Sequence, residues 1–239
     1  MSWLKRRVGS RPRPATVLGV DACPAGWIGI VLDHGVFAQA TIGRRLRELL
    51  DAVPTASVVA VDIPIGLPQR GWRRADVEAR RFLGKRSSSV FATPPRAAVE
   101  ASSYEEANRI CRSLTGQGLS RQAWALAPKI LDVDGCRNHL GPSLFEVHPE
   151  VSFRALATTS LTAGKRTWAG SVERRRLLEG AGIAIPDDIG PAGRGAGVDD
   201  VLDAAVAAWS ARRIADGTAH CLPDPPERDA HGRHTAIWY

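Results

Sequence analysis

The sequence predicts an α/β fold in which a mixed β-sheet carries helices on its faces. Two observations lead to this prediction. Three β-rich runs follow one another near the start of the chain, and a fourth run comes after a segment with helical spacing. Beyond them, helical patterns alternate with one further short strand. A strand meander that leads into strand–helix alternation is typical of a mixed sheet covered by helices. Because no repeat or domain boundary stands out, residues 15–239 are predicted to form a single domain.

The first four strands have clear local signals. Residues 15–33 predict a hairpin, since TVLGV and WIGIVL flank CPAG, which supplies Pro and Gly for a tight turn. GVFAQAT, residues 35–41, indicates a third strand, and residues 44–53 have helical spacing. In residues 56–68 the VVAV core is apolar on both faces, as in a buried strand. This strand is expected to end at Asp62, because Pro64 follows.

The second part of the chain is predicted to be mainly helical. Residues 69–140 form an insertion in which RADVEARRFLG and SYEEANRICRSL have amphipathic spacing. SLFEVHPEVSF, residues 143–153, predicts a short strand that would place Glu146, His148 and Glu150 on one face. Residues 172–183 predict a helix ended by glycines. GPAGRGAG is expected to be a flexible loop before a last, acidic helix, and the proline-rich tail is assigned no element.

Composition limits the class of protein and its partners. The 239 residues are 44% hydrophobic and 24% charged, which is typical of a soluble globular protein. The net charge of +7 favours an anionic partner, nucleic acid first. Four scattered cysteines without a Cys-x-x-Cys pair indicate reduced thiols in a cytoplasmic protein. No apolar run is long enough to cross a membrane. Residues 1–14 are predicted to be a disordered basic arm, because no apolar segment of an export signal follows the Arg pair.

Carboxylates in apolar surroundings are the chief chemical signal. They follow VLGV, follow VVAV, lie inside LFEVH, and crowd the head of the last helix: Asp21, Asp62, Glu146, Asp199, Asp200 and Asp203. A carboxylate buried without a partner is costly, and several that converge require a cation among them. Magnesium prefers oxygen ligands, so the set predicts a Mg²⁺ or Mn²⁺ site.

Each acid also has a structural alternative. A strand-end Asp often caps the next turn, and the face that carries Glu146 is equally compatible with solvent. In the last helix, Asp199 is well placed as the N-cap, and the helix dipole favours acids in the first turn. Asp200 and Asp203 lie about 60° apart on one helix face. Capping explains Asp203 poorly, because it lies a full turn inside the helix.

A basic run directly follows the Asp62 strand. Residues 70–86 read RGWRRADVEARRFLGKR, and such a run is usually a solvated helix face. Its position and Trp72 also favour contact with a phosphate backbone. The residues predicted to bind nucleic acid are Arg73, Arg74, Arg81, Lys85 and Arg86. For GPAGRGAG a plain flexible loop is favoured over a phosphate-binding loop, since Val-Asp-Asp follows where Gly-Lys-Ser/Thr is required.

Seven motifs occur in order from about Thr16 to the C-terminus: VLGVDACPAGW, VVAVDIPIGLP, SSSVFATPPR, TGQGLSRQAWAL, FEVHPEVSF, GKRTWAGSVERRRLL and DDVLDAA. As a set they resemble the uncharacterised family of predicted ribonuclease H-like nucleases. The wider superfamily includes ribonuclease H and the RuvC-type Holliday-junction resolvases. The resemblance implies a ribonuclease H-like mixed five-stranded sheet flanked by helices, with the helical insertion between the fourth and fifth strands. It also implies that SSSVFATPPR and TGQGLSRQ line a pocket particular to this family.

The resemblance extends to the site residues. In the resolvases an Asp ends the first strand, an acid ends the fourth, and a helix carries Asp-x-x-Asp-Ala. Asp21, Asp62, Asp200 and Asp203 match those places and would hold two metal ions, with Glu146 resembling an acid on the fifth strand of some relatives. The implied activity is a magnesium-dependent nuclease in which all five acids are catalytic. DNA and RNA are both open as substrates, and a dimer is compatible with the sequence.

Two other functions compete with this interpretation. The actin-like and sugar-kinase phosphotransferases share the core fold and a Gly-x-Asp hairpin, but they require a second copy of the phosphate motif that is not found here. A non-catalytic nucleic-acid-binding module would gain from losing the acids, because carboxylates repel phosphate.

Overall fold

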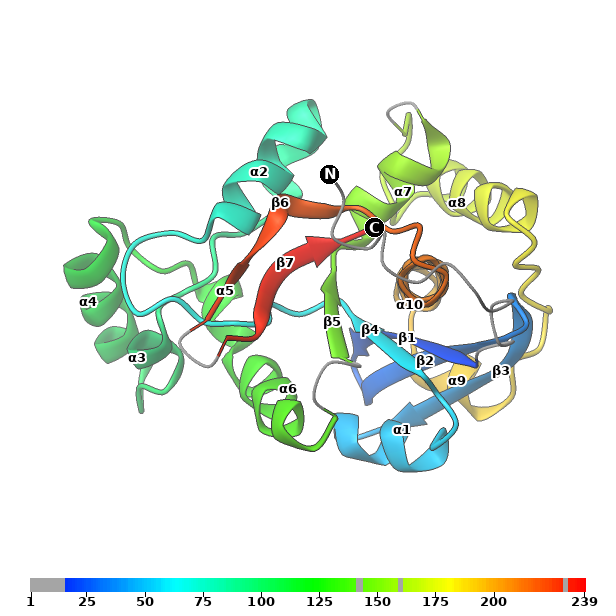
Figure 1. The fold of residues 1–239 in the computed structure, drawn as a ribbon, viewed down its shortest axis with the longest axis horizontal. Coiled ribbons are helices and arrows are strands. Elements are labelled where there is room, and N and C mark those ends of the chain that lie inside the picture. The colour runs from blue at the N-terminus through cyan, green and yellow to red at the C-terminus, as the bar shows by residue number, and fades with distance from the viewer. Residues whose placement is uncertain (1–15, 141–143, 159–160, 230–231) are drawn as a thin grey trace.

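A seven-stranded mixed sheet forms the centre of the molecule (Figure 1). The computed structural model describes residues 16–140, 144–158, 161–229 and 232–239. The strands lie in the order β3-β2-β1-β4-β5-β7-β6, with helices on both faces. The predicted α/β class with a mixed sheet is therefore confirmed. The predicted number of five strands is wrong, because β7 and β6 extend the sheet beyond β5. The predicted basic arm, residues 1–14, lies outside the described residues.

The predicted meander is present. β1 (Val17–Cys23) pairs antiparallel with β2 (Gly26–Asp33), and β2 pairs antiparallel with β3 (Val36–Gly43). The tight hairpin between β1 and β2 brings Gly26 against the end of β3. A Cβ added to Gly26 would lie 2.3 Å from the Gly43 carbonyl oxygen, and its φ of +133° also favours glycine.

The fourth strand is as short and as buried as its sequence indicates. α1 (Leu46–Ala52) leads into β4 (Val58–Val61), which pairs parallel with β1. All four residues of β4 are buried, because helices cover both faces of the sheet. Asp62 follows directly, and its backbone N–H donates to the Val20 carbonyl of β1 at 3.0 Å.

The segment between β4 and β5 is helical, as predicted. It contains α2 (Arg74–Leu83), the 3₁₀ helix η1 (Gly84–Ser89), α3 (Arg96–Val99), α4 (Tyr104–Thr115), α5 (Arg121–Ala125) and α6 (Ala127–Leu140). The last of these is part of the core. Ile130 and Val133 of α6 pack with Leu18 of β1 in the cluster on the α1 side of the sheet.

The fifth strand is shorter than predicted. β5 (Leu144–Val147) pairs parallel with β4, and α7 (Pro149–Ala157) begins two residues later. Pro149 starts this helix because its fixed φ suits the first helical position. The shared strand face predicted for Glu146, His148 and Glu150 is therefore wrong: only Glu146 is on the strand. Residue 143, the first of the predicted strand, lies outside the described residues.

The last helices also differ in detail from the prediction. α8 (Trp168–Gly180) and α10 (Val198–Ala215) are present, but GPAGRGAG contains a short helix, α9 (Pro191–Gly195), instead of only a loop. The N-cap of α10 is Gly197 and not Asp199. Asp200 contributes to this helix start by accepting the Gly197 backbone N–H at 3.0 Å.

The proline-rich tail forms two strands that the sequence did not reveal. β6 (Cys221–Arg228) pairs antiparallel with β7 (His234–Trp238), and β7 pairs parallel with β5. The three prolines of β6 lack backbone donors, and they are tolerated because β6 is the edge strand. Among the described residues, no helix combines the length and apolar character needed to cross a bilayer.

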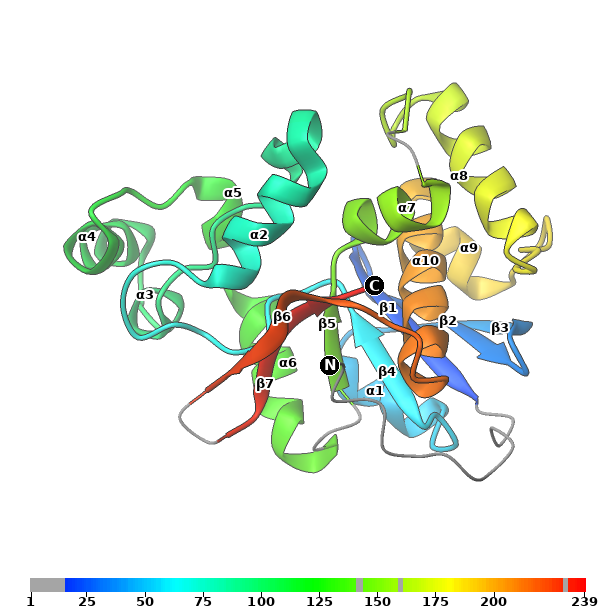
Figure 2. The same cartoon turned by 45° about the horizontal axis from the view of Figure 1, so that its top comes forward.

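Helix α10 lies directly on the sheet, beside α7 and α8 (Figure 2). The contact is made possible by Gly19 of β1. A Cβ at this position would lie 2.0 Å from the Ala208 nitrogen and 2.3 Å from the Ala204 oxygen. The glycine and the small helix residues thus allow backbone to approach backbone, which fixes the position of α10 relative to β1.

Candidate functional site

Three predicted acids converge where β1, β4 and α10 meet. Asp21 lies two residues after Gly19 on β1, so it projects from the same sheet face toward α10. Asp62 directly follows β4, the parallel neighbour of β1. Asp203 precedes Ala204, the helix residue that contacts Gly19, and only 1% of it is exposed. Strand ends and a closely packed helix therefore bring together carboxylates that are far apart in the sequence.

The three carboxylates share one electrostatic environment. Burial and the charges of Asp62 and Asp203 raise the pKa of Asp21 well above its usual value. Burial raises the pKa of Asp62 to about 7, although the charge of Lys165 opposes the shift. The pKa of Asp203 rises to about 6 for the same reason and with the same opposition. The site therefore retains protons near neutral pH unless a further cation enters it.

Lys165 is a cation of the site that the sequence did not reveal. Its Nζ donates to Asp203 Oδ2 at 2.6 Å, and its charge also acts on Asp21 and Asp62. Burial favours the neutral amine, but the charge of Asp203 outweighs it and raises the pKa of Lys165. The available signal is the motif GKRTWAG, in which Lys165 contributes only to the family resemblance.

One oxygen in the cluster has no partner. Asp203 Oδ1 is buried and accepts no hydrogen bond from any described residue. A buried, unsatisfied carboxylate oxygen is costly, and such atoms commonly mark a site that a ligand or an ion completes.

The other acids of the helix head lie further from this centre. Asp200 is half-buried, and burial is the main cause of its raised pKa. Its hydrogen bond to Gly197 ties it to the start of α10. Asp199 lies 3.6 Å from the guanidinium of Arg166. Asp203 is therefore the acid of α10 that belongs fully to the cluster.

Glu146 is held by an arginine that was predicted to bind nucleic acid. Both carboxylate oxygens accept from Arg73 at 2.7 Å, and Oε2 also accepts the Ile65 N–H at 2.6 Å. Arg73 is 6% exposed and also donates to Asp76 and to the Ile65 carbonyl. Its predicted role in nucleic-acid binding is thus corrected to a structural one, because its donors are already used. Glu146, predicted to be catalytic, has both oxygens engaged in this buried ion pair.

The other four residues predicted to bind nucleic acid fall into two groups, one engaged by the protein and one exposed to solvent. Arg86 donates to Glu150 and to the carbonyls of Leu161 and Ala163, so it supports the loop that leads to Lys165. Arg74 pairs with Glu78 on the exposed side of α2. Arg81 and Lys85 are exposed. Of the five residues predicted to bind nucleic acid, these last three have side chains that remain accessible to a phosphate backbone.

A second polar layer surrounds the carboxylates. Glu150, in the first turn of α7, forms an ion pair with the fully buried Arg174 of α8. His148 Nε2 contacts the Ser89 carbonyl at 3.3 Å, whereas its buried Nδ1 has no partner among the described residues. Burial lowers the pKa of His148. The SSSVFATPPR loop therefore lies beside the site, through Ser89.

The donor chemistry of the cluster suits a hard divalent cation. Carboxylate oxygens are the ligands that Mg²⁺ prefers, and the unpaired Asp203 Oδ1 could accept such an ion. Within the described part of the chain, however, no three His, Cys, Asp or Glu side chains form a group that could hold a metal ion. The present arrangement is adapted to the ammonium of Lys165, which would have to move for a metal ion to bind.

Comparisons with known proteins add one finding. A family described as "Protein of unknown function (DUF429)" matches residues 19–228, a range that contains all the predicted acids. Neither the curated proteins nor the solved structures include a match to this chain.

Proposed function

This chain belongs to the DUF429 family, and we propose that it is a metal-dependent nuclease with a ribonuclease H-like core. The observation that supports this best is the convergence of Asp21, Asp62 and Asp203 around a single ammonium group. All three carboxylates have raised pKa values, as the acids of functional sites often do. A purely structural cluster would gain from replacing them by apolar residues.

The residues of the cluster have distinct roles in this proposal. Asp21, Asp62 and Asp203 would hold the ion, and Asp200 would add negative charge from the helix start. A divalent ion in such a site activates water and stabilises the leaving oxygen of a phosphodiester. The displaced Lys165, whose side chain is 38% exposed, would stay beside the site and could pair with an anionic phosphate. Arg73 neutralises the charge of Glu146, so Glu146 repels the Asp62 carboxylate less.

The topology supports the ribonuclease H-like part of the proposal. Strands β3-β2-β1-β4-β5 are contiguous in the sheet and correspond to the five strands that the resemblance implies. The acids lie near the end of β1, directly after β4, and on the helix that carries Asp-Val-Leu-Asp-Ala. β6 and β7 are additions at the β5 edge and leave this arrangement intact.

The proposal is tested by metal binding and cleavage in the same set of proteins. Melting temperatures are measured with EDTA, Mg²⁺ or Mn²⁺ for the wild type, for Asp21→Asn and for Asp187→Asn, whose side chain is 96% exposed. Cleavage is screened on single-stranded, duplex, hybrid and branched substrates. A ligand at 100 times its Kd stabilises the folded state by about 2.7 kcal/mol.

We expect the wild type and Asp187→Asn to melt higher with Mn²⁺ and to cleave at least one substrate. Asp21→Asn should gain much less stability and cleave none, since it lacks the charge that balances the ion. If Asp21→Asn gains as much as the wild type and cleaves equally well, the carboxylates are not a metal site and the nuclease proposal is wrong.

A further inference from the structure

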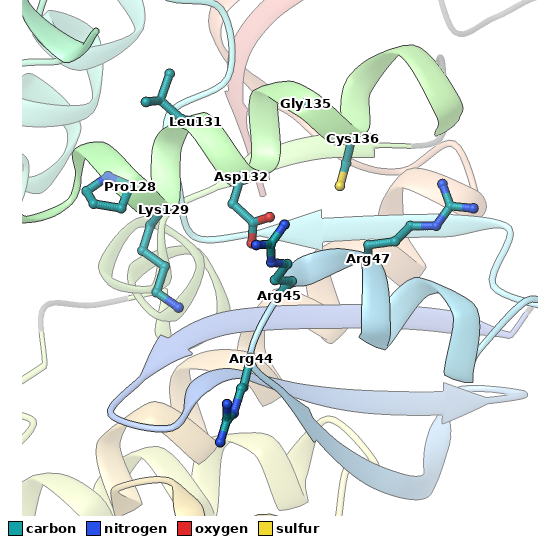
Figure 3. Close-up of a pocket in the computed structure, with 9 residues that line it drawn as sticks. All are labelled: Arg44, Arg45, Arg47, Pro128, Lys129, Leu131, Asp132, Gly135 and Cys136. Carbon is teal, nitrogen blue, oxygen red and sulfur yellow. The ribbon is translucent and has the colours of Figure 1, made fainter. Parts of the chain in front are cut away.

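A basic pocket of about 640 Å³ lies between the start of α1 and helix α6 (Figure 3). Its lining includes four cations and one carboxylate: Arg44, Arg45, Arg47, Lys129 and Asp132. Figure 3 shows Lys129 and Arg47 on either side of Asp132. The pocket therefore gathers more positive charge than its own acid can neutralise.

The charges of this pocket are only partly balanced within the protein. Both Arg44 and Arg45 are exposed, and among the described residues their side chains have no hydrogen-bond or ion-pair partner. Arg47 pairs with Asp51 at 2.9 Å on the solvent side of α1. A concave surface with unpaired guanidinium groups is suited to an anion, and the planar fork of arginine matches the oxygens of a phosphate group.

The single acid of the pocket is already engaged by the protein. Asp132 Oδ2 accepts from Trp27 Nε1 at 2.7 Å and from the Leu46 N–H at 2.9 Å. These bonds hold the start of α1 against the sheet. Lys129 is anchored beside it, since its ammonium donates to the Gly26 carbonyl and lies 4.3 Å from the centre of the Trp27 ring. Asp132 is thus a structural partner, and its single charge leaves the four cations of the pocket in excess.

The pocket lies at the same end of the sheet as the carboxylate cluster. Trp27, at the start of β2, is paired with Gly43, so Arg44 follows β3 at the end where β1 finishes. Asp21 is two residues from the end of β1, and Asp62 follows the parallel β4 at the same edge. The pocket is on the α6 side and the carboxylates are on the α10 side. The β1–β2 hairpin separates the two.

The carboxylate cluster acts electrostatically on one cation of the pocket. Burial lowers the pKa of Lys129, and the charge of Asp21 is among those that oppose this shift. A chain-like anion that crosses the tip of the hairpin would therefore meet both the cations and the carboxylates.

We infer that this pocket binds backbone phosphates of the nucleic-acid strand whose scissile bond reaches Asp21, Asp62 and Asp203. The inference rests on the proposed function and assigns its substrate-binding surface. The cations would position the strand without reading its sequence. Pro128 and Leu131 form an apolar wall against which a sugar or base can lie. A free mononucleotide offers the same phosphate chemistry, so the test must separate a strand from a small anion.

The test compares two double variants that lose the same charge. Arg44→Ala with Arg45→Ala empties the pocket of its unpaired cations, while Arg109→Ala with Arg176→Ala removes two exposed arginines from α4 and α8. Binding of labelled single-stranded and duplex oligonucleotides is measured in EDTA over a salt series, with AMP in a parallel titration. Melting temperatures confirm that both variants are folded.

We expect the pocket variant to bind the single strand roughly tenfold more weakly, with a salt slope lower by about 0.7 for each lost phosphate contact. The control variant should lose much less affinity. The inference is overturned if the pocket variant keeps the wild-type affinity and slope, if no oligonucleotide binds the wild type, or if only AMP binding is lost.

These experiments distinguish failure of the nuclease proposal from failure of the inferred binding surface. If the wild type binds the strand through this pocket but does not cleave it with any metal ion, the nuclease proposal fails and the binding surface stands. If the wild type cleaves and the pocket variant binds and cleaves equally well, the nuclease proposal stands and the binding surface fails.

Discussion

The ammonium of Lys165 lies 2.6 Å from Asp203 Oδ2, although the two residues are 38 positions apart. One comes from the loop before α8 and is partly exposed, and the other is buried in α10. This contact explains how the apolar helix α10 can contain a buried acid, because the ammonium balances the charge of the carboxylate. It also makes Lys165 an internal counter-ion at the place where the nuclease proposal requires a metal ion.

Replacement of Lys165 by Met should destabilise the metal-free protein and increase its response to metal. Met is unbranched and only one atom shorter than Lys, but it leaves the Asp203 carboxylate without a cation. We expect a loss of about 1–3 kcal/mol in the free energy of unfolding, less than for a wholly buried pair, because Lys165 is partly exposed. Urea unfolding in EDTA measures this loss, and the gain on adding Mn²⁺ should exceed that of the wild type.

The neighbouring Arg166 provides the matched control. Its side chain is 86% exposed and lies 3.6 Å from Asp199. Arg166→Met should change the free energy of unfolding by less than about 0.5 kcal/mol, as exposed pairs do. Equal losses in the two variants would show that the Lys165 contact has no special importance for the cluster.

The raised pKa of Asp62 predicts a pH dependence of stability. Because its pKa is about 7 in the folded protein and near 3.8 in the unfolded chain, the folded state binds more protons between these values. The metal-free wild type should therefore lose stability relative to Asp62→Asn as the pH rises from about 4 to 7. The difference should reach a few kcal/mol, because one extra bound proton changes the free energy of unfolding by about 1.4 kcal/mol per pH unit.

The measurement is urea unfolding of both proteins in EDTA across this range. Asp62→Asn should be the more stable protein at pH 8, and the two should differ least near pH 4. A constant difference across the range would mean that Asp62 titrates normally and lies outside the cluster. Mn²⁺ should reduce the wild-type deficit, since metal binding favours the deprotonated carboxylate.

A methyl group at Gly19 should separate α10 from β1. The added Cβ would lie 2.0 Å from the Ala208 nitrogen, a backbone atom that cannot move aside alone. Gly19→Ala should cost about 3 kcal/mol and also weaken the response to Mn²⁺, because Asp21 and Asp203 move apart. Gly180→Ala, with nothing within 4 Å of its added Cβ, should be neutral or stabilising by up to about 1 kcal/mol. Thermal melting of both variants with and without Mn²⁺ tests this expectation, which a native-like Gly19→Ala would contradict.

Two arginines of the basic run should differ in how much they contribute to the stability of the fold. Arg73→Met removes the partner of the buried Glu146 and Asp76 and should cost about 3–5 kcal/mol. Arg81→Met, on the exposed side of α2, should change stability by no more than about 0.5 kcal/mol. Chemical unfolding compares the two variants directly. Similar stabilities would show that the Arg73 ion pair contributes little to the fold.

Local patterns were sufficient for the first half of the sheet. The hairpin over β1 and β2, the third strand, and the buried VVAV strand have apolar runs separated by Gly and Pro, and the structure has all of them. β6 was missed because its prolines disfavour a strand locally, whereas an edge position next to a tertiary partner permits one. β7 has no proline, but it is short and its partners β5 and β6 come together only in the folded chain. The helix α7 was missed because Pro149 both ends a strand and begins a helix.

Only part of the candidate site could be predicted from the sequence. Asp21 and Asp62 could be recognised as strand-end acids, and Asp203 as a buried helix acid. The sequence could not show that Arg73 neutralises Glu146, since the two residues are 73 positions apart and a basic run resembles a solvated face. Lys165 was equally hidden, because only the folded chain brings its loop to α10.

The prolines of β6 have a consequence for assembly. Pro223, Pro225 and Pro226 cannot donate backbone hydrogen bonds, so the outer edge of β6 is a poor template for an incoming strand. The opposite edge of the sheet is β3, an eight-residue strand with mixed exposure and no proline. If a partner or second copy extends this sheet by strand addition, the β3 edge is the favourable side, because its backbone donors are not interrupted by proline.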